Sequence, residues 1–203
     1  MIKLTGLTKK YGKSLVVDDA SAMFPKGEVT SIIGPNGAGK STLLSMASRL
    51  TESDAGEVVI GDKLLAEWDT KELAKHLAVL RQSNNINMRF TIRELVCFGR
   101  FPHSQGRLKD EDHKIVDTAL EHLGITDIQN KYLDELSGGQ RQMAFIAMVV
   151  AQDMDYVFLD EPLNNLDIKH SVEIMQTLRR LAHEFNKAVV IVIHDINFAS
   201  CYS

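Results

Sequence analysis

Short apolar runs bounded by turn residues recur along this chain and predict strands. They lie at residues 2–8, 15–24 and 28–34 near the start of the chain, and at 155–162 and 188–195 near its end. Amphipathic segments separate several of these runs. Because strands that alternate with amphipathic helices form sheets covered by helices, we expect an α/β fold with a mostly parallel sheet.

The middle of the chain has a helical pattern instead. In residues 112–124 the apolar side chains recur at helical spacing, and residues 138–152 are apolar nearly all round in their second half. We therefore expect an inserted α-helical subdomain at 85–153. The α/β core would be formed by 1–84 and 154–203, and the whole chain would be a single domain.

Composition restricts the class of partner. The 23 Lys and Arg residues against 27 Asp and Glu residues give a formal net charge of −4, which argues against a dedicated nucleic-acid surface. Cys97 and Cys201 stand alone, so we expect two buried free thiols and a reducing compartment. We expect no signal peptide, and no apolar run approaches the ~18 residues that span a bilayer. Any work at a membrane would then go through a partner.

A glycine-rich stretch, GPNGAGKST, lies between a predicted strand and a predicted helix. It matches the pattern G-x-x-x-x-G-K-[ST], in which glycines let backbone N–H groups turn toward phosphates and a helix N-terminus adds positive charge. Lys40 would reach the β- and γ-phosphates of a nucleotide, and Ser41 would bind Mg²⁺. The residues that we assign to nucleotide binding here are Gly34, Pro35, Asn36, Gly37, Ala38, Gly39, Lys40, Ser41 and Thr42.

Polar side chains follow two of the predicted strands. Asp160 and Glu161 come directly after YVFL, and His194 comes after VIVI. Open α/β sheets bind ligands at the carboxyl ends of their strands, so we expect these side chains to lie near the glycine-rich loop. Asp160 suits a water-mediated hold on Mg²⁺, whereas Glu161 would polarise the attacking water.

A second anion-binding helix end is predicted at LSGGQRQ, residues 136–142. Ser137 is placed to cap the following helix, and Gly138 and Gly139 would expose its first amides. A simple kinase needs no such second site, so this feature favours a different class of nucleotide-binding protein.

These motifs, in this order over the whole chain, resemble the nucleotide-binding subunit of ATP-binding cassette (ABC) transporters. Residues 34–42 match the Walker A loop, and YVFLDEP matches Walker B. Residues 136–140 match the signature motif, and residues 163–167 match the D-loop, with Asn-Asn where Ser/Thr-x is commoner. The resemblance implies an α/β P-loop NTPase core with an N-terminal antiparallel β subdomain and an inserted α-helical subdomain.

The same resemblance implies roles for further residues. Tyr11 matches the aromatic residue that stacks on adenine, Gln82 matches the Q-loop residue that senses Mg²⁺ and the attacking water, and His194 matches the switch histidine. The catalytic residues implied are Lys40, Gln82, Glu161 and His194. The metal ligands implied are Ser41, Gln82 and Asp160.

In that family two subunits pair head to tail, and each ATP lies between the Walker A loop of one and the signature motif of the other. The residues that would hold the partner's ATP are Ser137, Gly138, Gly139 and Gln140, with Asp167 in the D-loop. The resemblance also implies Mg²⁺ as the cofactor of ATP, a homodimer, a transmembrane permease and, indirectly, a periplasmic or lipoprotein substrate-binding protein. The chain would then lie peripherally at the cytoplasmic face of the plasma membrane.

The stretch GRFPHSQGR bears on the cargo. It looks like the corresponding stretch of importers for iron–siderophore, haem and cobalamin, and Phe101-Pro102 and Gly106 predict a rigid, turn-rich loop. The loop is either a plain surface loop or, as the resemblance implies, a contact with the permease. We favour an iron(III)–siderophore chelate. Import of haem or cobalamin is an alternative, and so is a soluble ABC-type ATPase of an iron–sulfur assembly system.

Other ABC-type proteins fit the sequence less well. Chromosome-maintenance and DNA-repair relatives insert a long coiled coil, whereas Ser137 follows Lys40 by only 97 positions with no sustained heptads between them. Translation-factor relatives carry two cassettes. Members of the family usually continue well beyond the switch histidine, whereas this chain ends nine residues after His194. We therefore expect a C-terminus that is shortened relative to the family.

Overall fold

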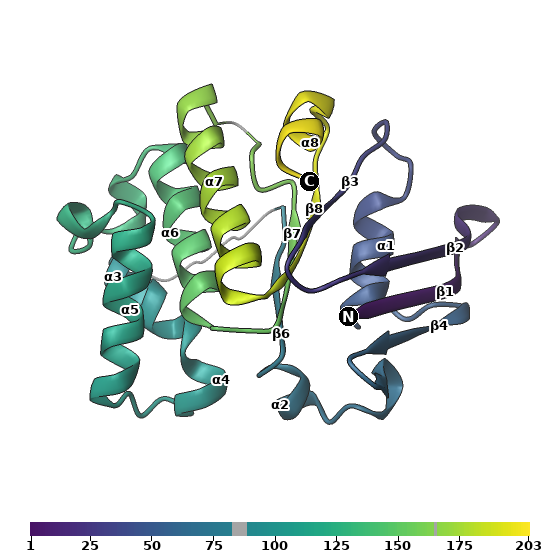
Figure 1. The fold of residues 1–203 in the computed structure, drawn as a ribbon, viewed down its shortest axis with the longest axis horizontal. Helices are drawn as coiled ribbons and strands as arrows, with labels where there is room; N and C mark the ends of the chain where they lie inside the picture. Colours follow the sequence, from purple (N-terminus) through teal and green to yellow (C-terminus); the bar gives the residue numbers. More distant parts are fainter. Residues whose placement is uncertain (83–88, 165) are drawn as a thin grey trace.

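The computed structural model describes residues 1–82, 89–164 and 166–203, and within them the strands form two sheets (Figure 1). The N-terminal sheet is antiparallel, with strand order β2-β1-β4-β5. This is the antiparallel β subdomain that the family resemblance implied. Its strands are β1 (Ile2–Tyr11), β2 (Ser14–Phe24), β4 (Ala55–Ile60) and β5 (Lys63–Leu64).

The second sheet is parallel, as predicted, with strand order β3-β8-β7-β6. In its register Val29 pairs with Val189, and Tyr156 pairs with Ala188. Because all the strands run the same way, their carboxyl ends meet at one edge, which is uppermost in Figure 1. Its strands are β3 (Val29–Ile32), β6 (Leu77–Leu80), β7 (Tyr156–Asp160) and β8 (Ala188–Val192).

Both faces of the parallel sheet are buried. On β7, Tyr156 and Phe158 pack in a cluster with α1 (Lys40–Ala47) and the antiparallel sheet. Val157 and Leu159, which alternate with them, pack in a second cluster with residues of the helices between β6 and β7 and of α7 (Ile168–Phe185). A strand that is buried on both faces needs apolar side chains at every position, which explains the uninterrupted run YVFL in the sequence.

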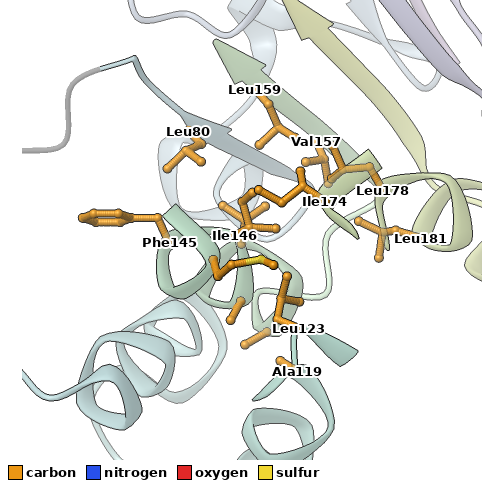
Figure 2. Packing of buried hydrophobic residues seen from close by; sticks show 14 of the residues in the cluster. Leu80, Ala119, Leu123, Phe145, Ile146, Val157, Leu159, Ile174, Leu178 and Leu181 are labelled. Carbon is orange, nitrogen blue, oxygen red and sulfur yellow. The ribbon is translucent and has the colours of Figure 1, made fainter. Parts of the chain in front are cut away.

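The second cluster joins the inserted helices to the sheet. Figure 2 shows Ile146 of α6 among Leu80 and Val157 of the sheet and Ile174 of α7. The helices other than α1 are α2 (Thr70–Leu73), α3 (Ile92–Gly99), α4 (Phe101–Ser104), α5 (Asp110–His122), α6 (Gly138–Ala151), α7 (Ile168–Phe185) and α8 (Ile196–Tyr202). Short 3-10 turns lie at η1 (Leu65–Glu67), η2 (Thr126–Ile128) and η3 (Leu133–Glu135).

Helices α3 to α6 lie between β6 and β7 in the chain. The division into an α/β core and a helical subdomain remains a prediction, and its boundary at residues 84 and 85 lies outside the described residues. In the described part of the chain, no helix is both long enough and apolar enough to cross a membrane.

The structure differs from the sequence-based expectations at three places. The stretch expected to be a turn-rich loop begins with the helical turn α4, and the chain turns only afterwards, where Gln105 and Gly106 have φ angles of 50° and 85°. Cys97 is half-buried and Cys201 is exposed, so the expectation of two buried thiols was wrong. Helix α8 was not predicted.

Candidate functional site

A pocket of about 600 Å³ lies at the carboxyl edge of the parallel sheet, within the size range of ligand sites. Apart from Val16 of β2, its lining comes from the segments that follow four parallel strands. The loop Asn36–Thr42 follows β3, Gln82 follows β6, Glu161 and Asn164 follow β7, and His194 follows β8. The strand order therefore brings together side chains that lie far apart in the sequence, as the sequence analysis predicted.

The loop before α1 depends on glycine at its last position. Gly39 has φ of 84° and is the N-cap of α1. A β-carbon there would lie 2.5 Å from the carbonyl oxygen of Val16, which is closer than real β-carbons come. The backbone of β2 therefore lies so close to the start of α1 that only glycine fits at position 39.

Lys40 extends back over this loop. Its Nζ donates to the carbonyl oxygens of Gly34 and Pro35, each at 2.9 Å, and its side chain is buried. Since a buried ammonium group needs acceptors, the two carbonyls hold the cation at the pocket that a phosphate group would enter.

Ser41 and Asp160 form the second polar pair of the site. The Ser41 hydroxyl donates to Asp160 Oδ1 at 2.8 Å. Burial raises the pKa of the Asp160 carboxyl above its ordinary value, although the hydrogen bond from Ser41 opposes this shift. The carboxylate is therefore under-solvated, as expected of a group that receives a cation.

Glu161 lies at the centre of a group of hydrogen-bond donors. Gln82 Nε2 donates to its Oε2 at 2.5 Å, Asn164 Nδ2 donates to the same oxygen, and His194 Nε2 lies 2.7 Å from its Oε1. The backbone of Glu161 has φ of 52°, in the left-handed region that is uncommon for residues other than glycine. Its amide donates to the carbonyl of Val192 at 3.0 Å, so the neighbouring strand fixes this turn.

Sequence reasoning missed two residues of the pocket, Asn164 and Val16. Asn164 stood in the D-loop match without a role of its own, and its spacing of three residues from Glu161 was the available signal. Val16 is an ordinary apolar strand residue, and nothing in the sequence marked it.

Tyr11 does not line the pocket, although it was expected to stack on adenine. It ends β1, is 53% exposed, and has Lys9 Nζ 5.7 Å from its ring centroid. Its role therefore remains a prediction from the resemblance.

The signature residues also lie outside this pocket, at the start of α6. Ser137 caps the helix by accepting from the Gln140 amide at 3.2 Å, and the Gln140 side chain accepts from the Ser137 amide at 3.2 Å. This capping box leaves Gly138 and Gly139 in the first turn. In Figure 1, α1, α6 and α7 all begin at the edge where the parallel strands end. The N-terminus of α6 therefore lies on the same side as the N-terminus of α1 that follows the glycine-rich loop.

The predicted D-loop residue Asp167 is the N-cap of α7. Its carboxylate accepts from the His170 amide at 2.8 Å, and this bond together with one from the His170 side chain lowers the Asp167 pKa. Asn165, which belongs to the same D-loop match, lies outside the described residues.

The stretch that was linked to the cargo is anchored by a buried ion pair. Arg100 is 7% exposed, its Nε donates to Asp112 Oδ1 at 2.9 Å, and its Nη1 donates to the carbonyl of Ala151 at 2.9 Å. The rings of Phe98 and Phe101, on either side of it, stack with centroids 5.7 Å apart and are 59% and 52% exposed. The arginine is therefore structural, whereas the aromatic pair faces outward.

Comparisons with known proteins agree with the motif order. The ABC transporter family profile matches residues 17–164. Over 203 residues, 100% of this chain and 81% of the relative, the chain is 59% identical to "Petrobactin import ATP-binding protein YclP" of Bacillus subtilis (strain 168). It is 44% identical over 195 residues to "Iron(3+)-hydroxamate import ATP-binding protein FhuC" of the same organism, covering 95% of this chain and 72% of that protein.

Among solved structures, the dimeric bacterial ABC transporter cassette MJ0796 is similar, with a TM-score of 0.87 and 33% sequence identity. The match covers 98% of this chain and 90% of that chain. The arrangement of the two sheets and the inserted helices is therefore shared over nearly the whole molecule.

Proposed function

The chain belongs to the ABC transporter family, and we propose that it is the ATP-hydrolysing subunit of an importer for iron(III)–siderophore chelates. One observation supports hydrolysis above all: the Glu161 carboxylate is held beside the phosphate loop by Gln82, Asn164 and His194. Similarity to import proteins named for petrobactin and for hydroxamates supports the cargo. Since these two names denote different chelates, the proposal stops at the siderophore class.

The hydrolytic roles follow from the positions of the groups. Lys40 would transfer its hydrogen bonds from the loop carbonyls to the β- and γ-phosphates. Glu161 would polarise the attacking water, which must lie between its carboxylate and the γ-phosphate. His194 and Gln82, which bond Glu161 in this structure, would orient the water and the γ-phosphate once the nucleotide is bound. ATP binding would therefore exchange bonds within the protein for bonds to the substrate.

Ser41 and Asp160 fit a Mg²⁺ ion bound together with ATP. Their oxygens lie 2.8 Å apart beside the pocket, and Mg²⁺ prefers hydroxyl, carboxylate and phosphate oxygens. Gln82 uses its amide nitrogen to bond Glu161, so its amide oxygen would be the third ligand. The ion would neutralise charge on the phosphates, while Ser41, Gln82 and Asp160 would position it.

Two copies of the chain would act together. The first turn of α6, with Gly138 and Gly139, lies outside the pocket of its own chain but begins at the same edge. In a head-to-tail dimer, Ser137 and these glycines would meet the γ-phosphate bound by the partner. Each chain would then contribute half of each of two ATP sites.

The permease would dock on the aromatic pair Phe98 and Phe101. The pair is exposed, large and rigid, because α3 carries one ring, α4 carries the other, and Arg100 anchors the junction to Asp112. Aromatic side chains on a rigid support are favoured contacts in interfaces. A helix of the permease on its cytoplasmic side would cover the rings, and the chain would lie peripherally at the membrane.

The test replaces the chromosomal copy with Glu161→Gln in the source cells and follows uptake of four cargo classes: catecholate and hydroxamate iron(III)–siderophores, haem and cobalamin. We expect uptake of one siderophore class to be lost while haem and cobalamin uptake continue. In the purified protein, ATP binding should be kept and turnover should fall about 100-fold or more, as for loss of a general base.

Other outcomes would contradict the proposal in identifiable ways. Loss of haem or cobalamin uptake alone would assign the chain to those importers. Normal uptake of all four classes, together with a fall in iron–sulfur enzyme activities, would assign it to an assembly system. Turnover at the wild-type rate would remove Glu161 from its role.

A further inference from the structure

The side chain of His170 makes a contact that capping does not require. Asp167 Oδ1 accepts twice from this residue, from the backbone amide at 2.8 Å and from the ring Nδ1 at 2.8 Å. The backbone bond alone satisfies the N-cap of α7. The hydrogen bond from the ring to Asp167 is therefore additional to the helix cap. Only histidine, or another side chain whose donor reaches the Asp167 carboxylate, can make it.

The same ring lies against the signature helix. A β-carbon built on Gly139 would lie 3.4 Å from His170 Nδ1, 3.5 Å from its Cγ and 3.6 Å from a methyl carbon of Leu166. A β-carbon at this position would thus be in van der Waals contact with both side chains, so His170 and Leu166 lie about one methyl group away from the second glycine of the signature motif. The His170 side chain is 33% exposed, which means that most of the ring is covered in this position.

The contact closes a path between two functional segments of one chain. Asn164, which bonds Glu161, precedes Leu166 and Asp167 in the D-loop segment. His170 then bonds Asp167 and lies beside Gly139. One end of this path is the chain's own Glu161, and the other end is the glycine proposed to meet the partner's ATP.

We propose that His170 is a positioning residue that ties the D-loop segment to the signature helix, so that the two segments approach the partner as one unit. This inference rests on the composite ATP site of the proposed function. Without the ring, Asp167 still caps α7, but the first turn of α6 loses the side chain that lies beside it and aligns it with the D-loop. Turnover should then fall while nucleotide binding stays intact, because His170 does not line the nucleotide pocket.

The experiment compares His170→Asn with His170→Gln and His170→Ala in the whole chain. The amide nitrogen of Asn occupies the position of the ring Nδ1, whereas Gln places its amide one carbon further out. Lys169→Ala is the matched control, because Lys169 is the preceding residue on α7 and its side chain is 81% exposed. The measurements are kcat and KM for ATP, Tm, and the dependence of wild-type specific activity on protein concentration.

We expect kcat to fall about tenfold in His170→Ala and His170→Gln, the effect of one hydrogen bond to a charged group. KM and Tm should stay close to wild type in both variants. His170→Asn should restore kcat to within about twofold, and Lys169→Ala should match wild type.

Three results would overturn the inference. Wild-type kcat in His170→Ala would show that the tie is not needed, and failure of His170→Asn to restore kcat would show that the hydrogen bond is not the tie. A fall in Tm that parallels the loss of kcat would assign His170 to helix stability. Failure of the proposed function would be recognised separately. If wild-type specific activity did not rise with protein concentration, both the composite ATP site and the inference about His170 would be overturned.

Discussion

Replacing Arg100 with Met should destabilise the chain strongly without affecting nucleotide binding. The substitution keeps an unbranched apolar side chain but removes the charge and every donor. The Asp112 carboxylate, whose side chain is 10% exposed, would then keep only its bond from the Lys109 amide at 2.9 Å. The carbonyl of Ala151 at the end of α6 would also lose its bond from Arg100.

The expected cost follows from burial. Removing one partner of a buried ion pair leaves a charge without compensation and costs about 3–5 kcal/mol. The remaining bond from Lys109 places the expected loss at the lower end, about 3 kcal/mol. For a domain of this size, each kcal/mol corresponds to about 2–4 °C in Tm, so Tm should fall by about 6–12 °C.

The assay is urea unfolding combined with calorimetry, and Arg180→Met is the matched control. Arg180 pairs with Glu184 on the surface of α7, where both side chains are 54% exposed, so its loss should cost under about 1 kcal/mol. ATP affinity should be unchanged in Arg100→Met, because neither Arg100 nor Asp112 lines the pocket.

The pair can be isolated with a double-mutant cycle that adds Asp112→Asn. Hydrogen bonds from the Lys109 amide and from Arg100 lower the Asp112 pKa, so the stabilisation is fully present above the ordinary aspartate pKa of about 3.9 and is lost as the pH falls through the lower folded value. A loss for Arg100→Met no larger than that of Arg180→Met, or additive single substitutions, would refute the reasoning.

Two further predictions concern carboxylates elsewhere in the fold. Asp160→Asn should raise Tm and weaken Mg²⁺-dependent ATP affinity in titrations. Burial raises the Asp160 pKa, so the stability of the wild-type chain is lost as the pH rises through that folded value. Asn keeps an acceptor for the Ser41 hydroxyl without the charge. Asp155 is partly buried, but bonds from Lys26 and His76 outweigh this and lower its pKa. Its stabilisation should be present above about pH 4 and lost below it, so acid titrations of wild type and Asp155→Asn should converge; a constant difference would contradict this.

The sequence predicted the part of the site that topology alone determines. Lys40 follows one apolar strand, Asp160 and Glu161 follow another, and His194 follows a third. In a parallel sheet these ends share an edge whatever the details of packing, so strand recognition was enough to place them together. Gln82 was placed by resemblance, and the structure brings it to Glu161 because β6 is the neighbour of β7.

The sequence could not separate structural from exposed residues in the stretch around Arg100. An arginine in a turn-rich segment is usually at the surface. Its burial depends on Asp112, in the first turn of α5, and on the carbonyl at the end of α6. Three segments must be packed before this pair exists, and no local pattern encodes that arrangement. Phe98 and Phe101, which look like core residues by type, remain exposed, and no local pattern marks this either.

The backbone of Glu161 is the place where local preference and structure disagree most directly. Residues with a β-carbon disfavour left-handed φ angles, yet Glu161 has a φ angle of 52°. The conformation persists because the Glu161 amide bonds the carbonyl of Val192 on β8, the strand that also delivers His194. The bond that fixes the turn and the side chain that contacts the carboxylate therefore come from one strand. A local rule is broken here where the carboxylate faces donors from Gln82 and His194 on two other segments, and from Asn164 three residues further on. A rule that considers neighbouring residues alone does not predict this arrangement.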